Sequence, residues 1–424
     1  MSKFITRRSF LKNSAATLAA AKVLLPFGGA YASDAPEVNA IKLGFIALTD
    51  SSPLIVAKEK GLFDKYGLTA VEVLKQASWG ATRDNLVLGA GGNGIDGAHL
   101  LTPMAYGLST GAITQDKQPV PMKILARLNL DGQGISVSKA FADLKVGTDA
   151  SPLKAAFAKK KAAGAAAKIA VTFPGGTHDL WMRYWLAAGG INPDTDVEMI
   201  VVPPPQMVAN MKVGTMDAFC VGEPWNAQLV TQDIGYSALT TGELWTKHPE
   251  KSLALRADFT DKNPKAAQAL LMAVMEAQKW ADADANKDEL ADIVAKRAWF
   301  NIDKNDILGR LKGEFDYGNG KVVKASPHAM KFWRDQASFP FKSHDTWFLT
   351  ENQRWGRVKA DADIAGLVSK VNGADLWRSA AKSLGVSDIP SSDSRGVEKF
   401  FDGKSFDAAD PKAYLASLAI KAGA

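Results

Sequence analysis

Hydrophobic and polar positions along the chain alternate between strand-like and helix-like patterns. Residues 41–46 (IKLGFI) form a short apolar run typical of a buried strand. Residues 53–60 follow as a helix, with Pro53 in its first turn and Gly61 at its end. Residues 70–74 (AVEVL) are the next strand. This strand–helix–strand order with short connections predicts a layered α/β domain with a mainly parallel sheet.

A weak internal repeat divides the chain into two similar parts. In the first part, a strand near Val71 and a helix precede GIDGA at residues 94–98. In the second part, a strand at 197–202 and a helix precede GTMDA at residues 214–218. Two units of related topology predict two lobes. Ligands of open α/β sheets bind at the carboxyl ends of the strands, so two facing lobes would enclose a ligand between them.

The N-terminus has the pattern of a cleavable export signal. TRRSFLK at residues 6–12 precedes an Ala/Leu-rich stretch at 15–25, and AYA at 30–32 matches a cleavage site. The arginine pair followed by FLK resembles the twin-arginine export signal. The apolar stretch contains Lys22 and is too short to span a bilayer. We therefore expect a soluble protein that the twin-arginine pathway exports to the periplasm.

These patterns also suggest where the lobes begin and end. We expect a signal peptide at residues 1–32, the first part of lobe I at 33–130, and lobe II at 131–250. Residues 251–424 are expected to return to lobe I and to add a C-terminal extension. The segment beyond Phe315 is expected to cover the outside of that first lobe.

The basic net charge belongs largely to the export signal. The whole chain has 51 basic and 45 acidic residues, and residues 1–32 contain five of the basic residues and none of the acidic ones. The remaining 46 basic and 45 acidic residues leave a net charge of +1. We therefore expect no binding of nucleic acid. The only cysteine, Cys220, can form no internal disulfide, and its apolar neighbours predict a buried thiol.

Two glycine motifs match known catalytic or cofactor motifs but lie in the wrong context. GAGGNG at residues 89–94 matches the dinucleotide-binding pattern, yet a helix precedes it and a strand follows, which reverses the required order. GLSTG at 107–111 matches a nucleophile elbow, but Ser109 ends a helix here. The five histidines lack zinc-site spacing, and no calcium loop is visible. We expect no cofactor, no metal and no enzymatic activity, and a periplasmic enzyme remains an alternative.

Three segments that follow predicted strands carry groups able to hold an anion. FPGGTHDLW at residues 173–181 indicates a turn that opens a helix, where free N–H groups and the helix dipole favour an anion. His178, in the first turn, adds a donor. Trp79 follows the strand at 70–74 with its indole N–H, and Gly222 follows another strand with its backbone N–H. Purely structural roles are the alternative: a surface histidine beside a helix cap, and a tryptophan packed into its lobe.

These segments resemble the nitrate- and bicarbonate-binding proteins of ABC transporters, from about residue 40 to 350. The similar blocks are LTD at 48–50, ASWG at 77–80, DGQG at 131–134, GGTHD at 175–179, CVGEPWN at 220–226 and HPEK at 248–251. The resemblance implies a two-lobed, clamp-like (type II) periplasmic solute-binding fold with the anion in the cleft. It also implies the binding residues Trp79, Gln133, His178, the backbone at Gly222, and Lys251.

The chemistry of these residues suits nitrate. Nitrate is planar, carries one negative charge and only accepts hydrogen bonds, and all five groups can donate them. Bicarbonate binders of this family are expected to use an acidic residue and a bound calcium where this chain has Lys251. We therefore favour nitrate, with nitrite or cyanate as similar ions. Glu250 is adjacent, so an alignment shifted by one residue would favour bicarbonate instead.

The resemblance also implies how the protein works and what it contacts. The lobes would close on the anion and deliver it to the permease and ATPase subunits of an ABC transporter, with contact to the inner membrane only through the permease. A bicarbonate-binding protein that uses calcium and a nitrate sensor remain the alternatives.

Overall fold

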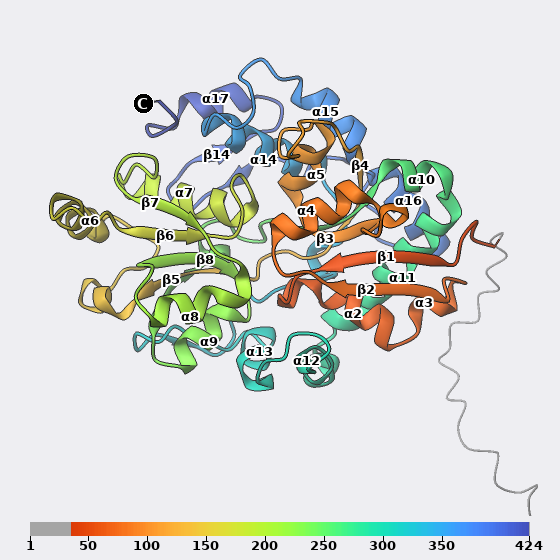
Figure 1. Cartoon of the computed structure of the whole chain (residues 1–424), viewed down its shortest axis with the longest axis horizontal. Helices are drawn as coiled ribbons and strands as arrows, with labels where there is room; N and C mark the ends of the chain where they lie inside the picture. The colour runs from red at the N-terminus through yellow and green to blue at the C-terminus, as the bar shows by residue number, and fades with distance from the viewer. Residues whose placement is uncertain (1–34, 424) are drawn as a thin grey trace, which may run out of the picture. The chain divides into compact units, whose positions relative to one another are not determined.

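The computed structural model describes residues 35–423, so the predicted export signal at residues 1–32 lies outside the described part of the chain. The described residues form two α/β lobes, and each lobe is built on a five-stranded sheet (Figure 1). The two-lobed solute-binding fold that the sequence predicts is confirmed. Among the described residues, no helix is both long enough and apolar enough to cross a membrane.

The first sheet has the strand order β2-β1-β3-β10-β4. Strand β1 pairs in parallel with β2 and β3, and β10 pairs antiparallel with β3 and β4. Its strands are β1 (Ala40–Phe45), β2 (Ala70–Lys75), β3 (Gly97–Leu101), β4 (Met122–Arg127) and β10 (Lys251–Arg256).

The second sheet has the order β7-β6-β8-β5-β9, with β6 parallel to β7 and β8, and β5 antiparallel to β8 and β9. Its strands are β5 (Gln133–Ser138), β6 (Lys168–Val171), β7 (Glu198–Val201), β8 (Ala218–Gly222) and β9 (Gly235–Thr240).

Both sheets are therefore mixed, but four strands of each run in one direction and one strand, β10 or β5, runs against them, so the expectation of mainly parallel sheets is confirmed. The opposing strand of each sheet is the one that arrives from the other lobe. Strand β5 begins where the parallel strand β8 ends, because Gln133 pairs with Gly222. Strand β10 begins where β3 ends, because Lys251 pairs with Leu101. A strand that enters at this edge runs against the parallel strands that end there.

The two crossing connections pair with each other. The Asp131 N–H donates to the His248 carbonyl at 3.0 Å, and the Leu128 N–H donates to the Lys251 carbonyl at 2.7 Å. The Glu250 N–H donates to Asn129 at 3.2 Å. We call this pair of segments, residues 128–131 and 248–251, the crossing ribbon. It leads into β5 on one side and into β10 on the other.

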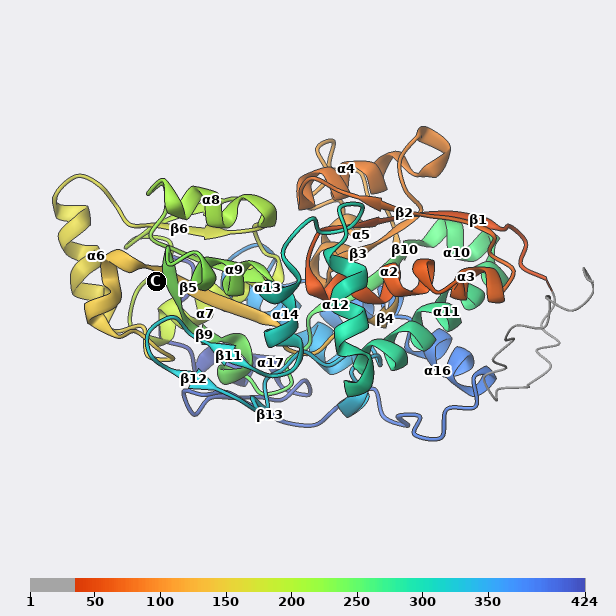
Figure 2. The ribbon, with the colours of Figure 1, turned by 90° about the horizontal axis from the view of Figure 1, so that it is seen from below.

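Helices pack on both sheets and bridge the lobes. Helix α12 packs on α2 of the first lobe, and α13 packs on α9 of the second lobe (Figure 2). The helices up to this point are α2 (Ser52–Glu59), α3 (Leu62–Lys65), α4 (Trp79–Leu88), α5 (Thr102–Ser109), α6 (Pro152–Ala162), α7 (Thr177–Ala188), α8 (Met207–Lys212), α9 (Trp225–Thr231), α10 (Ala257–Lys262), α11 (Pro264–Asp282), α12 (Lys287–Ala295) and α13 (Lys304–Leu311).

The C-terminal segment packs against both lobes rather than only the first one. Helix α16 packs on β4, whereas Phe400, Phe406 and Tyr414 belong to the hydrophobic core of the second lobe. Helix α14 contacts both α5 and α7. Its elements are β11 (Phe315–Asp316), β12 (Val322–Val323), α14 (Lys342–Arg354), α15 (Ile364–Val371), α16 (Ala374–Ser383), β13 (Glu398–Lys399), β14 (Ser405–Phe406) and α17 (Pro411–Ala416). The expectation failed because its scattered aromatic residues show burial but not which core they join.

Candidate functional site

Strand and helix ends bring the predicted binding residues to one place. Gln133 opens β5, Lys251 opens β10, and Gly222 ends β8. His178 is the second residue of α7. Trp79 opens α4, where the Ser78 hydroxyl caps the helix by accepting from the Ala81 N–H at 3.1 Å. These five segments belong to both lobes, so the site lies between the lobes.

The Lys251 ammonium is at the centre of the site. Its Nζ lies 2.8 Å from a Glu250 carboxylate oxygen and 3.0 Å from Asp50 Oδ2. It lies 3.4 Å from Gln133 Oε1 and 3.4 Å from His178 Nε2. All five side chains are buried. We call these residues, Asp50, Gln133, His178, Glu250 and Lys251, the Lys251 cluster.

Hydrogen bonds fix the orientation of the amide and the imidazole. His178 Nε2 lies 2.6 Å from Gln133 Oε1, and because an amide oxygen only accepts, Nε2 carries the hydrogen. His178 Nδ1 lies 2.6 Å from the Thr172 hydroxyl, which can donate to it. The Gln133 amide donates to Asp50 Oδ2 at 3.0 Å. His178 therefore has a neutral ring, and its Nε2–H points toward the Gln133 side chain.

Trp79 adjoins the Lys251 cluster through His99. The two rings lie 5.3 Å apart between centroids, and His99 Nε2 donates to Asp50 Oδ1 at 2.6 Å. The Trp79 indole N–H is buried and has no hydrogen-bond partner among the described residues. An unpaired buried donor is rare and costly, and it is satisfied when a bound acceptor lies against it.

Gly222 allows the other groups to approach its backbone closely. A Cβ at this position would lie 2.7 Å from Gln133 Oε1 and 3.3 Å from Asp50 Oδ2. Any larger residue would therefore push both side chains out of place. The φ angle of Gly222 is not in the left-handed region, so its backbone conformation does not require glycine. The close contacts around its Cα are what require glycine at this position.

The structure adds three residues that the sequence analysis did not assign to the site: Asp50, His99 and Glu250. Asp50 lies in the short helix Thr49–Ser51 just after β1, and its position in a block of the family resemblance was an available signal. Glu250 was named only as the neighbour of Lys251. Its other oxygen accepts the indole N–H of Trp181. His99 lies in β3 without any short-range partner in the sequence, so no local pattern identifies it.

Burial and charge pairing determine the protonation states. Burial opposes the charge of Lys251, but Asp50 and Glu250 outweigh it and raise the pKa of the ammonium. Burial also opposes ionisation of Asp50, but Lys251 and His99 outweigh it and lower that pKa. Burial raises the pKa of Glu250, although Lys251 opposes the shift. Burial, reinforced by Lys251, lowers the pKa of His178 far below its ordinary value.

The arrangement suits reversible capture of a small acceptor ion. It presents an ammonium, an imidazole N–H, an amide and an unpaired indole N–H in a site without contact with bulk water. Within residues 35–423, no group of three or more His, Cys, Asp or Glu side chains is arranged to hold a metal ion.

Two α/β lobes that enclose a buried cluster of donors define a solute-binding protein with the fold of the periplasmic binding proteins. Residues 34–295 match the model of the NMT1-like family. The nitrate/nitrite binding protein NrtA of Synechococcus elongatus is 56% identical, over 100% of this chain and 99% of that relative. The chain belongs to the NMT1-like family.

Two further similarities bear on the ligand. The crystal structure of the periplasmic nitrate-binding protein NrtA from Synechocystis PCC 6803 matches with a TM-score of 0.89 and 59% identity, covering 91% of this chain and 100% of that one. The bicarbonate-binding protein CmpA of Synechococcus elongatus is 43% identical over 98% of both chains. The nitrate-binding relatives are thus more similar to this chain than the bicarbonate-binding relative.

Proposed function

We propose that this chain binds nitrate, with nitrite or cyanate as ions of similar size and charge, at the Lys251 cluster. The bound ion would then pass to the permease of an ABC transporter. The relatives named for nitrate binding, which share 56–59% of their residues with this chain, support this reading. The observation that carries the proposal is the convergence of one ammonium and several N–H donors in a buried site.

Within this proposal, five groups contact the ion. The Lys251 ammonium neutralises its charge, while the Trp79 indole, the His178 imidazole, the Gln133 amide and the Gly222 backbone N–H donate to its oxygens. The unpaired indole N–H of Trp79 supports this assignment, because it is a buried donor that still needs an acceptor. The neutral state of His178 fits too, since its N–H is the donor that a planar oxyanion needs.

A bicarbonate-binding function with calcium is the second candidate. Two observations favour it: the 43% identity to CmpA, and the position of two carboxylates, Asp50 and Glu250, in the Lys251 cluster. The Lys251 ammonium lies against both carboxylates and would repel a divalent cation there. Nitrate is therefore the better candidate.

Isothermal titration calorimetry of the mature protein separates the two candidates. Nitrate is titrated alone, and bicarbonate is titrated with and without calcium. Micromolar nitrate binding, about −8 kcal/mol, is the expected result. Calcium-dependent bicarbonate binding without a nitrate response would refute the proposal. Recovery of unchanged nitrate after long incubation tests the alternative of a periplasmic enzyme.

We propose in addition that the protein acts in the periplasm after export by the twin-arginine pathway. The pattern at residues 6–12 and the periplasmic NrtA relative support this location. The boundaries proposed for the lobes, 33–130, 131–250 and 251–424, belong to the same proposal. Replacement of Arg7 and Arg8 by lysine is expected to stop export, and fractionation of the cells measures it. A sensor that signals to another protein is distinguished by nitrate uptake, which would persist when the gene is deleted.

A further inference from the structure

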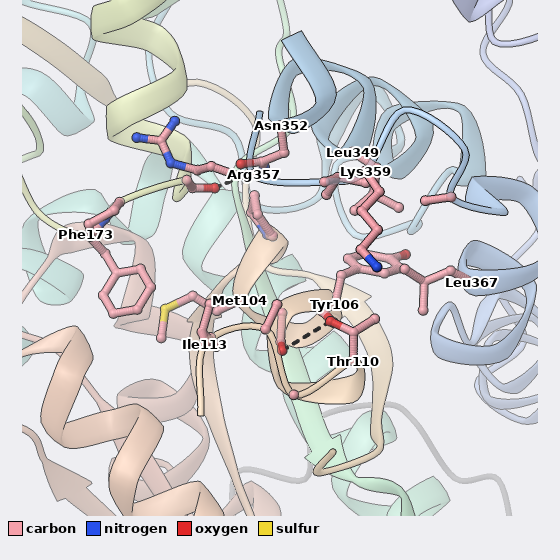
Figure 3. Close-up of a pocket in the computed structure, with 18 of the residues that line it drawn as sticks. Met104, Tyr106, Thr110, Ile113, Phe173, Leu349, Asn352, Arg357, Lys359 and Leu367 are labelled. Carbon is pink, nitrogen blue, oxygen red and sulfur yellow. Dashed lines mark hydrogen bonds between the residues drawn. The ribbon is translucent and has the colours of Figure 1, made fainter. Parts of the chain in front are cut away.

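A cavity that is separate from the Lys251 cluster lies where both lobes meet the C-terminal segment (Figure 3). Its volume is about 440 Å³, which is in the range of small-molecule sites. One wall is helix α5 of the first lobe, the second is the turn at residues 173–175 of the second lobe, and the third is formed by residues 349–367.

The lining combines apolar walls with positive charge. Met104, Ile113, Phe173, Leu349 and Leu367 supply the apolar surface. The charged residues of the lining are all basic, namely Lys117, Arg357 and Lys359. A cavity of this kind favours an anion that carries an apolar body, because the walls bury the body and the cations receive the charge.

Two of these cations have capacity left for a ligand. Arg357 binds Asp179 Oδ2 through Nη2 at 3.0 Å, while its Nη1 is buried without a partner among the described residues. Figure 3 shows Lys359 extending its amino group toward Tyr106 and Thr110, across the cavity from Met104 and Phe173. Among residues 35–423, no side-chain hydrogen bond or ion pair involves this amino group.

We propose that this cavity binds a small organic anion with an apolar body, such as a short aliphatic carboxylate, and that its occupancy strengthens anion binding at the Lys251 cluster. The effect on anion binding at the Lys251 cluster rests on the proposed function. The binding of an organic anion in the cavity does not, because it depends only on the residues that line the cavity.

Two walls of the cavity continue directly into the Lys251 cluster. The turn at 173–175 leads into α7 and His178, and it is held by Asn352, which donates to the Gly175 carbonyl at 3.1 Å. A Cβ at Gly175 would lie 2.6 Å from Asn352, so this wall fits closely against α14. Helix α5 begins at Thr102, whose hydroxyl donates to the Glu250 carbonyl at 2.5 Å.

An occupant that touches α5 and the turn therefore holds together the two lobes that enclose the anion. Ligands that favour the same arrangement strengthen each other's binding by the same factor. We expect a saturating occupant to increase nitrate affinity about fivefold, which lies at the lower end of typical coupling. Nitrate should increase the affinity for the occupant by an equal factor.

The test uses sodium octanoate as the probe, with octan-1-ol as its uncharged counterpart, in calorimetric titrations of the full mature protein. Lys359→Gln removes an exposed cation of the lining, and Ala362→Trp fills the cavity from its wall. Lys370→Gln is the matched control, since Lys370 is exposed and does not line the cavity.

Octanoate is expected to bind more tightly than octan-1-ol. Lys359→Gln should weaken octanoate binding about fivefold, the loss of one partly solvated charge-assisted bond. Ala362→Trp should abolish it, and Lys370→Gln should leave it unchanged. Nitrate binding in the absence of octanoate should be equal in all three variants.

Three results would overturn the inference. One is that the wild type binds no octanoate up to about 10 mM, which means that any binding free energy is weaker than about −3 kcal/mol. Another is octanoate binding that Ala362→Trp does not affect, because the probe would then bind elsewhere. The third is bound octanoate that leaves nitrate affinity unchanged, which refutes the coupling. Failure of the wild type to bind nitrate at all would instead refute the proposed function, and the octanoate titrations would still test the cavity.

Discussion

Replacement of Lys251 by methionine tests the centre of the proposed site. Methionine keeps most of the length of the side chain but removes the ammonium, which lies 2.8 Å from Glu250 and 3.0 Å from Asp50 in a fully buried environment. If nitrate accepts a charge-assisted hydrogen bond from this ammonium, its loss costs about 1.5–3 kcal/mol of binding. The dissociation constant for nitrate should therefore rise by a factor of about 10 to 150.

The same substitution should also destabilise the fold. Removing one partner of a buried ion pair leaves an uncompensated charge and typically costs about 3–5 kcal/mol. The double variant Lys251→Met, Asp50→Asn also removes the Asp50 charge and leaves Glu250, whose pKa burial already raises, so it should regain part of this stability while nitrate binding stays weak. Lys312→Met is the matched control, because this lysine pairs with Asp288 at the surface and its loss should cost under about 1 kcal/mol.

Two measurements on each variant decide the matter. Urea unfolding followed by circular dichroism gives the free energy of unfolding, and calorimetry gives the nitrate dissociation constant of the protein that is folded. A folded Lys251→Met variant that binds nitrate within twofold of the wild type would remove Lys251 from the site. Lost binding together with a stability equal to that of the wild type would refute the buried ion pair instead.

Four further predictions follow from the same contacts. Gly222→Ala places a Cβ 2.7 Å from Gln133 Oε1 and should weaken nitrate binding about tenfold by calorimetry, the cost of a displaced donor; unchanged affinity would contradict the close approach. Trp79→Phe removes the unpaired indole N–H but keeps the ring, so affinity should fall about fivefold, and no change would show that this N–H does not contact the ion. Nitrate affinity should stay constant between about pH 8 and 6.5, because burial lowers the pKa of His178 far below its ordinary value and the neutral ring already carries the Nε2 hydrogen; calorimetry in two buffers of different ionisation enthalpy should give equal heats, and a proton taken up on binding would refute it. Burial lowers the pKa of His248 to about 4, so the folded protein keeps this ring neutral at pH values below 6.5 where the unfolded chain protonates it. The free energy of unfolding should therefore decrease as the pH falls from 6.5 toward 4. Thermal unfolding should show a smaller decrease for His248→Gln in that window, and an equal decrease would refute the assignment.

Much of the fold follows from local patterns in the sequence. The apolar run at 41–46 and the Pro53 helix predict the start of the first lobe, and the structure has β1 and α2 there. The pairing direction of β5 and β10 was not predictable in this way. Their residues are buried like those of the parallel strands, and direction is decided by the edge at which the chain enters from the other lobe. That is a long-range property, which no short window contains.

The site was predictable where a motif carried the chemistry. His178 follows a glycine turn that opens a helix, and the indole, amide and ammonium were transferred from the family blocks; the structure places these groups in or beside the Lys251 cluster. His99 carries no such local signal. It lies 49 residues from Asp50 in the sequence, and only the parallel pairing of β1 with β3 brings the two side chains together. A contact between two residues this far apart can be predicted only once the order of the strands in the sheet is known.

The position of the site at the crossing ribbon suggests how capture is linked to movement of the lobes. Gln133 and Lys251 are the first residues of the two strands that follow the crossing ribbon, so each is close in sequence to a connection between the lobes. Segments that join two domains absorb the changes in backbone angles when those domains close. An ion that accepts bonds from both residues therefore acts directly on both connections. We infer that closure needs no relay through distant side chains, because the groups that hold the anion and the segments that bend are neighbours in the chain.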